Sequence, residues 1–166
     1  MRVIAPRIYN FWAMPVIDLP DEAATAAFAA RVAAVATGGD IIALRGDLGA
    51  GKTTFARAFI HARGYEEEVP SPTFTLVQVY EVGPTEIWHF DLYRLNSPDE
   101  AWELGIEDAF VEGISLIEWP DRLGLLLPQR RLEITLLFGE QPEARHAALD
   151  AAQDWLGRLT GIIPDA

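Results

Sequence analysis

The chain has 166 residues, of which 50% are hydrophobic and none is cysteine, and its formal net charge is −12 at pH 7. This length and composition predict one globular domain with a substantial core, and the lack of cysteine excludes disulfides and thiolate metal sites. The negative charge argues against a large surface for binding nucleic acid, because such binding depends mainly on basic side chains that neutralise phosphates.

The first residues show neither helical nor strand periodicity. We therefore expect residues 1–13 to form an N-terminal extension outside the fold, and residues 14–166 to form the folded domain. No apolar run approaches the roughly 18 residues of a membrane-spanning helix, and the N-terminus lacks the apolar core of a secretory signal. The sequence thus predicts a cytoplasmic protein with no membrane segment.

Strand and helix patterns alternate in the next part of the chain. Residues 14–18 fit an edge strand, and Asp21 begins an alanine-rich helix that ends at two glycines, residues 38–39. The apolar run 41–45 predicts a buried strand, and residues 55–60 predict a helix. A loop that joins a buried strand to a helix in this way is the usual setting of a phosphate-binding loop.

That loop fits the template G-x-x-x-x-G-K-[ST] with Gly46, Gly51, Lys52 and Thr53. In such a loop the backbone N–H groups surround phosphates, the lysine reaches the β and γ oxygens, and the hydroxyl ligates Mg²⁺. The chain contains twelve arginines but one lysine, which is Lys52, so a solvated lysine in a glycine-rich turn is the weaker reading. The predicted nucleotide-binding residues of the loop are Asp47, Leu48, Gly49, Ala50, Gly51, Lys52, Thr53 and Thr54.

Three further segments end in side chains suited to phosphate chemistry. Residues 69–74 contain two prolines that exclude regular helix, and predict a stiff loop that carries Thr73. This loop resembles the switch segments that sense a γ-phosphate, and a structural turn is the alternative. Residues 75–91 predict a hairpin that ends at Asp91, and residues 113–118 predict a buried strand that ends at Glu118. Chemistry in α/β folds concentrates at such strand ends.

The last third of the chain completes the expected fold. Residues 97–104 predict a capped helix, residues 105–110 a short turn, and residues 132–138 a strand. Residues 144–150 fit either a returning strand or the start of a final helix, which presents Trp155, Leu156 and Leu159 on one face. The sum is an α/β fold: a single-domain P-loop NTPase with a mixed β-sheet flanked by helices, in which the loops at Thr73, Asp91 and Glu118 converge over the phosphate loop.

Phosphoryl transfer requires cations at the phosphates, a magnesium site and a group that orients the attacking water or hydroxyl. Lys52 and Thr53 meet the first need. Asp91 and Glu118 compete as the further metal-side ligand, direct or through water, because both follow an apolar strand. We place Asp91 near Mg²⁺ and Glu118 at the attacking water. Glu118 and Lys52 are thus the predicted catalytic residues, and the predicted metal set is Thr53, Asp91 and Glu118. The alternatives are a strand-end turn residue for Asp91 and a surface acid for Glu118.

Nearby residues permit two readings each. Trp119 either stacks on the nucleotide base, which places it among the candidate cofactor-binding residues with Thr73, or fills the core. His89 fits a packed core position better than a catalytic one. Arg94 fits either a phosphate contact or an ion pair with a neighbouring acid.

Five segments, in this order and spacing, resemble the bacterial TsaE (YjeE) family: GDLGAGKTTFARAF, SPTFTLVQVYE, HFDLYRL, ELGIEDAF and LIEWPDRL. The resemblance covers roughly residues 16–138 and departs from the family at Asp121, where the family often has glutamate. By this resemblance, the family's nucleotide-binding and carboxylate positions fall on Gly49, Gly51, Lys52, Thr53, Thr54, Asp91 and Glu118.

The resemblance implies an ATPase that binds ATP and Mg²⁺ and supports tRNA threonylcarbamoyladenosine biosynthesis. In the family it acts on partner proteins of the TsaD and TsaB type, so that tRNA is reached only indirectly, which agrees with the charge of −12. Two other functions remain open: a small-molecule or nucleoside kinase, which would need an arginine-rich lid, and a nucleotide-binding switch module without turnover. A guanine-specific switch would need a second lysine, which the chain lacks.

Overall fold

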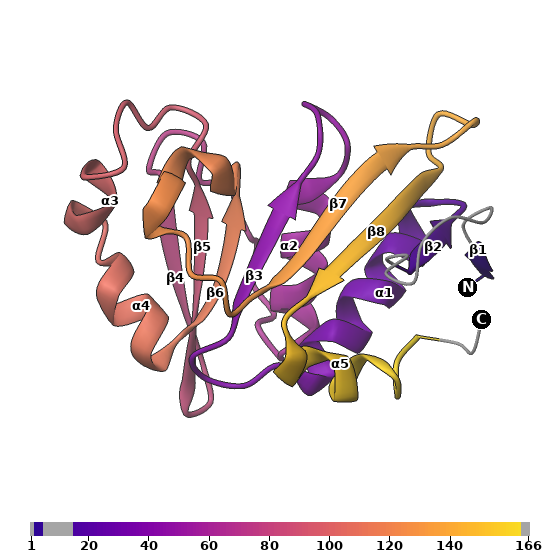
Figure 1. Ribbon diagram of the computed structural model, residues 1–166, viewed down its shortest axis with the longest axis horizontal. Helices are drawn as coiled ribbons and strands as arrows, with labels where there is room; N and C mark the ends of the chain where they lie inside the picture. Colours follow the sequence, from indigo (N-terminus) through magenta and orange to yellow (C-terminus); the bar gives the residue numbers. More distant parts are fainter. Residues whose placement is uncertain (1, 5–14, 164–166) are drawn as a thin grey trace.

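The computed structural model describes residues 2–4 and 15–163, and these described residues form an eight-stranded sheet with the order β1-β2-β8-β7-β3-β6-β5-β4 (Figure 1). The strands are β1 (Arg2–Ile4), β2 (Val16–Leu19), β3 (Ile41–Arg45), β4 (Val77–Val82), β5 (Thr85–Asp91), β6 (Ile114–Glu118), β7 (Leu132–Phe138) and β8 (Arg145–Ala151). The helices are α1 (Glu22–Val35), α2 (Lys52–Ala62), α3 (Glu100–Glu103), α4 (Ile106–Glu112), the 3-10 helix η1 (Pro120–Leu126) and α5 (Gln153–Leu159).

The centre of the sheet is parallel and its flanks are antiparallel, which confirms the predicted mixed sheet. Strand β3 runs parallel to β6 on one side and to β7 on the other, and β5 runs parallel to β6. In this register Leu44 lies beside Glu118, and Glu118 lies beside Asp91. The strand ends that carry the carboxylates therefore meet the end of β3, from which the phosphate loop leaves.

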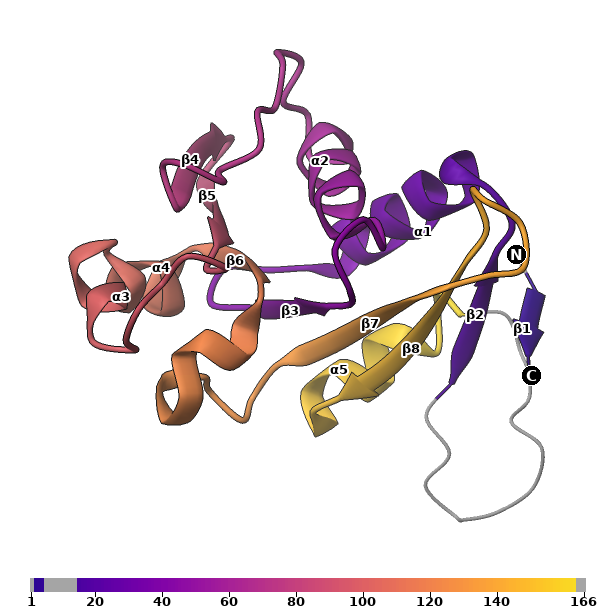
Figure 2. The same cartoon turned by 90° about the horizontal axis from the view of Figure 1, so that it is seen from above.

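Two hydrophobic clusters cover the sheet, and alternation along the strands explains both. Ile42 and Leu44 of β3 join a cluster with α1, α2 and α5, whereas Ile41 joins a cluster with α3, α4 and η1. The same alternation in β6 sends Leu116 to the first cluster and Ile117 to the second. Figure 2 shows α1 and α2 together on one side of β3. Helix α2 is therefore held rigidly against the strand that precedes the phosphate loop.

Several elements differ from the sequence-based expectation. Residues 105–110 were expected to form a short turn, but residues 106–112 form helix α4, because Gly105 adopts a left-handed conformation (φ 82°) that starts a new helix after α3. The undecided segment is strand β8, which pairs antiparallel with β7. On α5, Trp155 and Leu159 are buried as expected, but Leu156 is 53% exposed. Only two of the three residues expected on the buried face of this helix therefore belong to it.

The N-terminal segment also differs in part. Strand β2 was expected at the edge of the sheet, but β1 pairs with it on the outer side. Strand β1 lies within residues 1–13, which we expected to lie outside the fold. The expected boundary between residues 13 and 14 falls outside the described residues, so the division into extension and domain stays a prediction.

Candidate functional site

The phosphate loop leaves β3 after Arg45 and enters α2 at Lys52, as the template predicts. Its backbone requires glycine at Gly46, where φ is 141° and an added Cβ would lie 2.6 Å from the carbonyl oxygen of Leu136 on β7. Gly51 also has a positive φ, 106°, and stands directly before the first turn of α2. The N-terminus of α2, with its free N–H groups, therefore faces the space enclosed by the loop.

Lys52 lies at the base of the loop and is only 5% exposed. Its Nζ donates hydrogen bonds to the carbonyl oxygens of Gly46 (2.6 Å) and Asp47 (3.0 Å), and lies 4.1 Å from the centre of the Trp119 ring. Burial lowers the pKa of the Lys52 ammonium, while the negative charges of Glu118 and Asp91 act in the opposite direction. A phosphate would add further negative charge to a cation that is already partly desolvated.

The two predicted carboxylates lie next to each other and are largely buried, with 3% of Glu118 and 7% of Asp91 exposed. Oε1 of Glu118 accepts a hydrogen bond from Thr53 Oγ1 (2.8 Å), and Oε2 lies 2.7 Å from His89 Nε2. Oδ1 of Asp91 accepts from the backbone N–H of Tyr93 (3.1 Å), and Oδ2 is 3.4 Å from Thr73 Oγ1. Thus Glu118 contacts the phosphate-loop hydroxyl, whereas Asp91 contacts the proline-stiffened loop.

These side chains surround one cavity of about 240 Å³. The expected convergence of three loops over the phosphate loop is therefore present in the geometry. The cavity is lined by Leu48, Gly49, Gly51, Lys52, Thr53, Thr54, Thr73, Asp91, Tyr93, Glu118 and Trp119. Of the predicted site residues, Asp47 lines a neighbouring cavity instead, and Ala50 is fully buried beneath the loop.

The donor set suits magnesium bound together with phosphates. Within residues 2–4 and 15–163, no group of three or more His, Asp or Glu side chains could hold a metal ion by itself. Nucleotide-bound Mg²⁺ does not need such a group, because phosphate oxygens and water fill most of its coordination sphere and the protein adds one or two oxygen ligands. Thr53 and Glu118, already hydrogen-bonded to each other, fit that role, with Asp91 beside them.

Trp119 is not part of the core. It directly follows Glu118 with φ 57° and ψ 52°, a left-handed conformation that is rare for a bulky residue and often occurs at functional sites. Its ring lies 5.0 Å from the Tyr93 ring, as well as over Lys52. Trp119 therefore forms a wall of the cavity of about 240 Å³.

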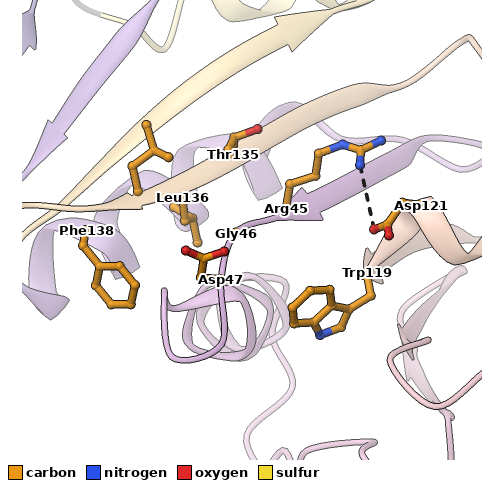
Figure 3. Close-up of a pocket in the computed structure, with 9 residues that line it drawn as sticks. Arg45, Gly46, Asp47, Trp119, Asp121, Thr135, Leu136 and Phe138 are labelled. Carbon is orange, nitrogen blue, oxygen red and sulfur yellow. Dashed lines mark ion pairs between the residues drawn. The ribbon is translucent and has the colours of Figure 1, made fainter.

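The other side of this wall belongs to a second cavity, of about 310 Å³, in which Arg45 reaches toward Asp121 with 3.8 Å between Nη1 and Oδ1 (Figure 3). Arg45 Nε also contacts Glu133 Oε1 at 2.6 Å, so its charge is already balanced. The lining consists of Arg45, Gly46, Asp47, Trp119, Asp121, Thr135, Leu136, Leu137 and Phe138.

Sequence reasoning missed Arg145, at the start of β8. Its Nε donates to the carbonyl oxygen of Ala50 (2.9 Å) and its Nη2 to that of Gly49 (3.1 Å), while Nη1 holds the turn between β7 and β8 at Pro142 (2.8 Å) and Ala144 (2.8 Å). One guanidinium thus ties the phosphate loop to the β7–β8 turn. No local pattern could have indicated this contact, because the partners are 95 and 96 residues apart.

Arg94 and His89 take positions that the sequence left open. In the described structure the Arg94 guanidinium lies over the ring of Phe74, 4.6 Å from its centre, instead of in the expected ion pair, and its phosphate contact stays a prediction. His89 is fully buried, as expected of a core residue, but its ring contacts Glu118. No pattern near His89 in the sequence indicated that contact, because it depends on the register between β5 and β6.

Comparison with known proteins identifies the family. The family profile described as "Threonylcarbamoyl adenosine biosynthesis protein TsaE" matches residues 19–147. The chain belongs to the TsaE family. A TsaE protein of Bacillus subtilis (strain 168) is 42% identical over 118 residues, covering 70% of this chain and 72% of that protein. A TsaE protein of Haemophilus influenzae is 40% identical over 119 residues, covering 71% and 73% respectively.

A solved structure of a related protein supports the fold. The crystal structure of Bacillus subtilis YdiB matches this chain with a TM-score of 0.73 and 29% identity, covering 89% of this chain and 92% of that one. The P-loop NTPase fold expected from the sequence is thereby confirmed. As a member of the TsaE family, the chain is related to proteins of tRNA threonylcarbamoyladenosine biosynthesis. Among the described residues no helix is both long and apolar enough to cross a membrane.

Proposed function

We propose that this chain is an Mg²⁺-dependent ATPase that supports the formation of threonylcarbamoyladenosine in tRNA. The observation that carries the proposal is the single cavity into which the phosphate loop, Thr73, Asp91 and Glu118 all project. That cavity combines a buried ammonium, a helix N-terminus and two carboxylates, which are the components that phosphoryl transfer to water requires. Membership of the TsaE family supplies the pathway.

Each residue has a defined part in this proposal. Lys52 exchanges the carbonyl oxygens of Gly46 and Asp47 for phosphate oxygens. Thr53 and Glu118 would together hold Mg²⁺, a role that their hydrogen bond of 2.8 Å supports. Bound Mg²⁺ would neutralise charge that develops on the phosphate oxygens.

Asp91 then becomes the carboxylate that orients the attacking water, next to Thr73 at 3.4 Å. This assignment exchanges the roles that we expected for Asp91 and Glu118 from the sequence. It rests on which carboxylate contacts the hydroxyl of Thr53.

The chain acts, in this proposal, in the cytoplasm through protein partners of the TsaD and TsaB type, and reaches tRNA only through them. The formal charge of −12 supports this, because an acidic protein surface repels the phosphates of the tRNA backbone. A nucleotide-binding module without turnover would show the same binding but no phosphate release.

A kinase is the less favoured alternative, because the clustered arginines that could form its lid, Arg122, Arg130 and Arg131, already make other contacts. Arg130 Nε lies 3.0 Å from Asp154 Oδ2, and Arg131 Nη2 lies 2.9 Å from Glu133 Oε2. Arg122 packs on the Tyr93 ring, 5.7 Å from its centre. To close over the phosphates during their transfer, each of these arginines would have to break its present ion pair or ring contact.

Calorimetric titration with ATP and GTP, with and without Mg²⁺, tests the binding part of the proposal. We expect ATP to bind, Lys52→Ala to abolish binding, and Lys52→Arg to fail nearly as badly, because a planar guanidinium does not replace a compact ammonium. Glu118→Gln should raise the Mg²⁺ concentration needed for binding. Tight ATP binding by Lys52→Ala would contradict the proposal.

A further inference from the structure

His89 is a buried polar residue that the proposed mechanism does not yet use. Its exposed fraction is 0%, and its Nε2 lies 2.7 Å from Oε2 of Glu118. Alternation along β5 sends His89 and Ile87 to the face covered by α2, and the same alternation along β6 sends Glu118 and Leu116 there. The two side chains therefore meet beneath the phosphate loop.

The contact completes the fixation of the Glu118 carboxylate. Thr53 Oγ1 binds one oxygen of the carboxylate at 2.8 Å and His89 binds the other at 2.7 Å. With both oxygens held, the carboxylate cannot rotate about the Cγ–Cδ bond of Glu118, and Oε1 stays toward Thr53. A carboxylate with one free oxygen would instead sample several orientations inside the cavity.

The ring of His89 has a defined protonation pattern in this setting. An ionised carboxylate only accepts hydrogen bonds, so Nε2 carries the proton that is shared with Glu118. Nδ1 of His89 is buried and has no hydrogen-bond partner among the described residues. A hydrogen on Nδ1 would be a buried donor without an acceptor among the described residues, which is costly. The geometry therefore fits a hydrogen on Nε2, where Glu118 accepts it.

We propose that His89 is a positioning residue that holds Glu118, through its Nε2–H group, in the orientation that ligates magnesium with Thr53. This inference rests on the proposed function of Glu118. It explains why a polar ring occupies a strand position whose register neighbours are Gln78 on β4 and Leu116 on β6. A purely structural residue at a fully buried position would be more stable as an apolar side chain of similar size.

Substitution of His89 separates positioning from packing. His89→Gln retains an amide donor, whereas His89→Leu fills the space without one. Loss of a hydrogen-bond partner of a metal ligand typically weakens metal affinity by about 10–100-fold. We expect His89→Leu to raise the Mg²⁺ concentration for half-maximal ATP binding by about that factor, and His89→Gln to restore most of it. Thermal melting of each variant shows whether the fold is retained.

A double-mutant cycle then tests whether His89 acts through Glu118. In the Glu118→Gln background, His89→Leu should have no further effect on the Mg²⁺ requirement, because the ligand that it positions is already changed. If His89→Leu and Glu118→Gln instead raise the Mg²⁺ requirement independently, so that their factors multiply in the double variant, the inference is overturned. If Glu118→Gln alone leaves the Mg²⁺ requirement unchanged, the role of Glu118 fails and that of His89 falls with it. If Glu118→Gln raises the requirement but His89→Leu does not, only the His89 inference is overturned.

The tautomer gives a readout that needs neither nucleotide nor turnover. In the parent protein labelled with ¹⁵N, long-range proton–nitrogen NMR correlations distinguish protonated from bare ring nitrogens. The sequence contains three histidines, so the signals that vanish in His89→Gln belong to His89. We expect a bare Nδ1 and a protonated Nε2. A proton on Nδ1 with a bare Nε2 would overturn the inference, even if both substitutions impaired folding.

Discussion

Replacement of Arg145 by alanine should loosen the phosphate loop, because it removes the donor to two loop carbonyls while every residue of the loop itself is kept. The guanidinium donates to the carbonyl oxygens of Gly49 and Ala50, and so holds the two peptide groups that lead into Gly51 and helix α2. Hydrogen bonds from charged donors contribute about 1.5–3 kcal/mol each. We take the lower value for the two loop contacts, because the freed carbonyls can be hydrated, which gives a loss of about 3 kcal/mol.

For a domain of this size, that loss corresponds to a fall in Tm of about 6–12 °C. If about half of it is needed to reorder the loop around a phosphate, ATP affinity falls about tenfold. Thermal melting and calorimetric ATP titration measure the two effects. The matched control is Arg130→Ala, which removes a mostly exposed arginine that contacts Asp154 and should change neither value appreciably. An Arg145→Ala protein that melts within about 2 °C of the parent and binds ATP within about twofold would refute this reasoning.

Three further predictions concern other parts of the chain. Gly46→Ala should abolish ATP binding, because the added Cβ would lie 2.6 Å from the Leu136 carbonyl oxygen. The control Gly49→Ala has nothing within 4 Å of its Cβ and should cost only about 1 kcal/mol of conformational strain. Equal effects of the two substitutions in thermal melting and ATP titration would contradict this. Burial lowers the pKa of Lys52, so its ammonium loses its charge at a lower pH than that of an exposed lysine, and ATP affinity in calorimetry should decline as the pH rises through that lowered pKa. An affinity that stays constant up to the pH at which an exposed lysine titrates would count against this reasoning. Arg158→Ala leaves the buried carboxylate of Asp40 without the two guanidinium donors that now lie 2.6 and 3.1 Å away. The free energy of unfolding, measured with denaturant, should fall by about 3 kcal/mol. A fall of less than about 1 kcal/mol would show that the pair is dispensable.

Much of the fold follows from local patterns in the sequence. The phosphate loop was predicted because its glycines, lysine and threonine stand at fixed spacings, and because the loop joins an apolar run to a helical pattern. The convergence of Asp91 and Glu118 was predicted because each ends an apolar strand, and strands parallel to β3 end at the same edge of the sheet.

The remaining features depend on contacts between distant segments. Nothing near Arg145 in the sequence indicates that it holds the phosphate loop, because only the β7–β8 pairing brings it there. His89 has the burial expected of a core residue, and only the register between β5 and β6 places its ring against Glu118. Helix α4 was missed for a local reason, since Gly105 was taken as the first residue of a short turn, whereas its left-handed backbone begins a helix.

The division of roles between the two carboxylates could not be derived from the sequence either. Both follow apolar strands and both lie near a hydroxyl-bearing loop. The hydrogen bond between Thr53 and Glu118 depends on where the end of β6 lies relative to the start of α2. No spacing along the chain encodes that relative position.

Phosphate release from ATP by the parent protein and by Asp91→Asn, at saturating ATP and Mg²⁺ with partner proteins of the TsaD and TsaB type present, tests the proposed ATPase most directly. We predict that the parent releases phosphate and that Asp91→Asn still binds ATP but releases phosphate about 10²–10⁴-fold more slowly, the range typical of groups that position or activate a reacting water. No release by the parent, or release by Asp91→Asn within about twofold of the parent, would contradict the account.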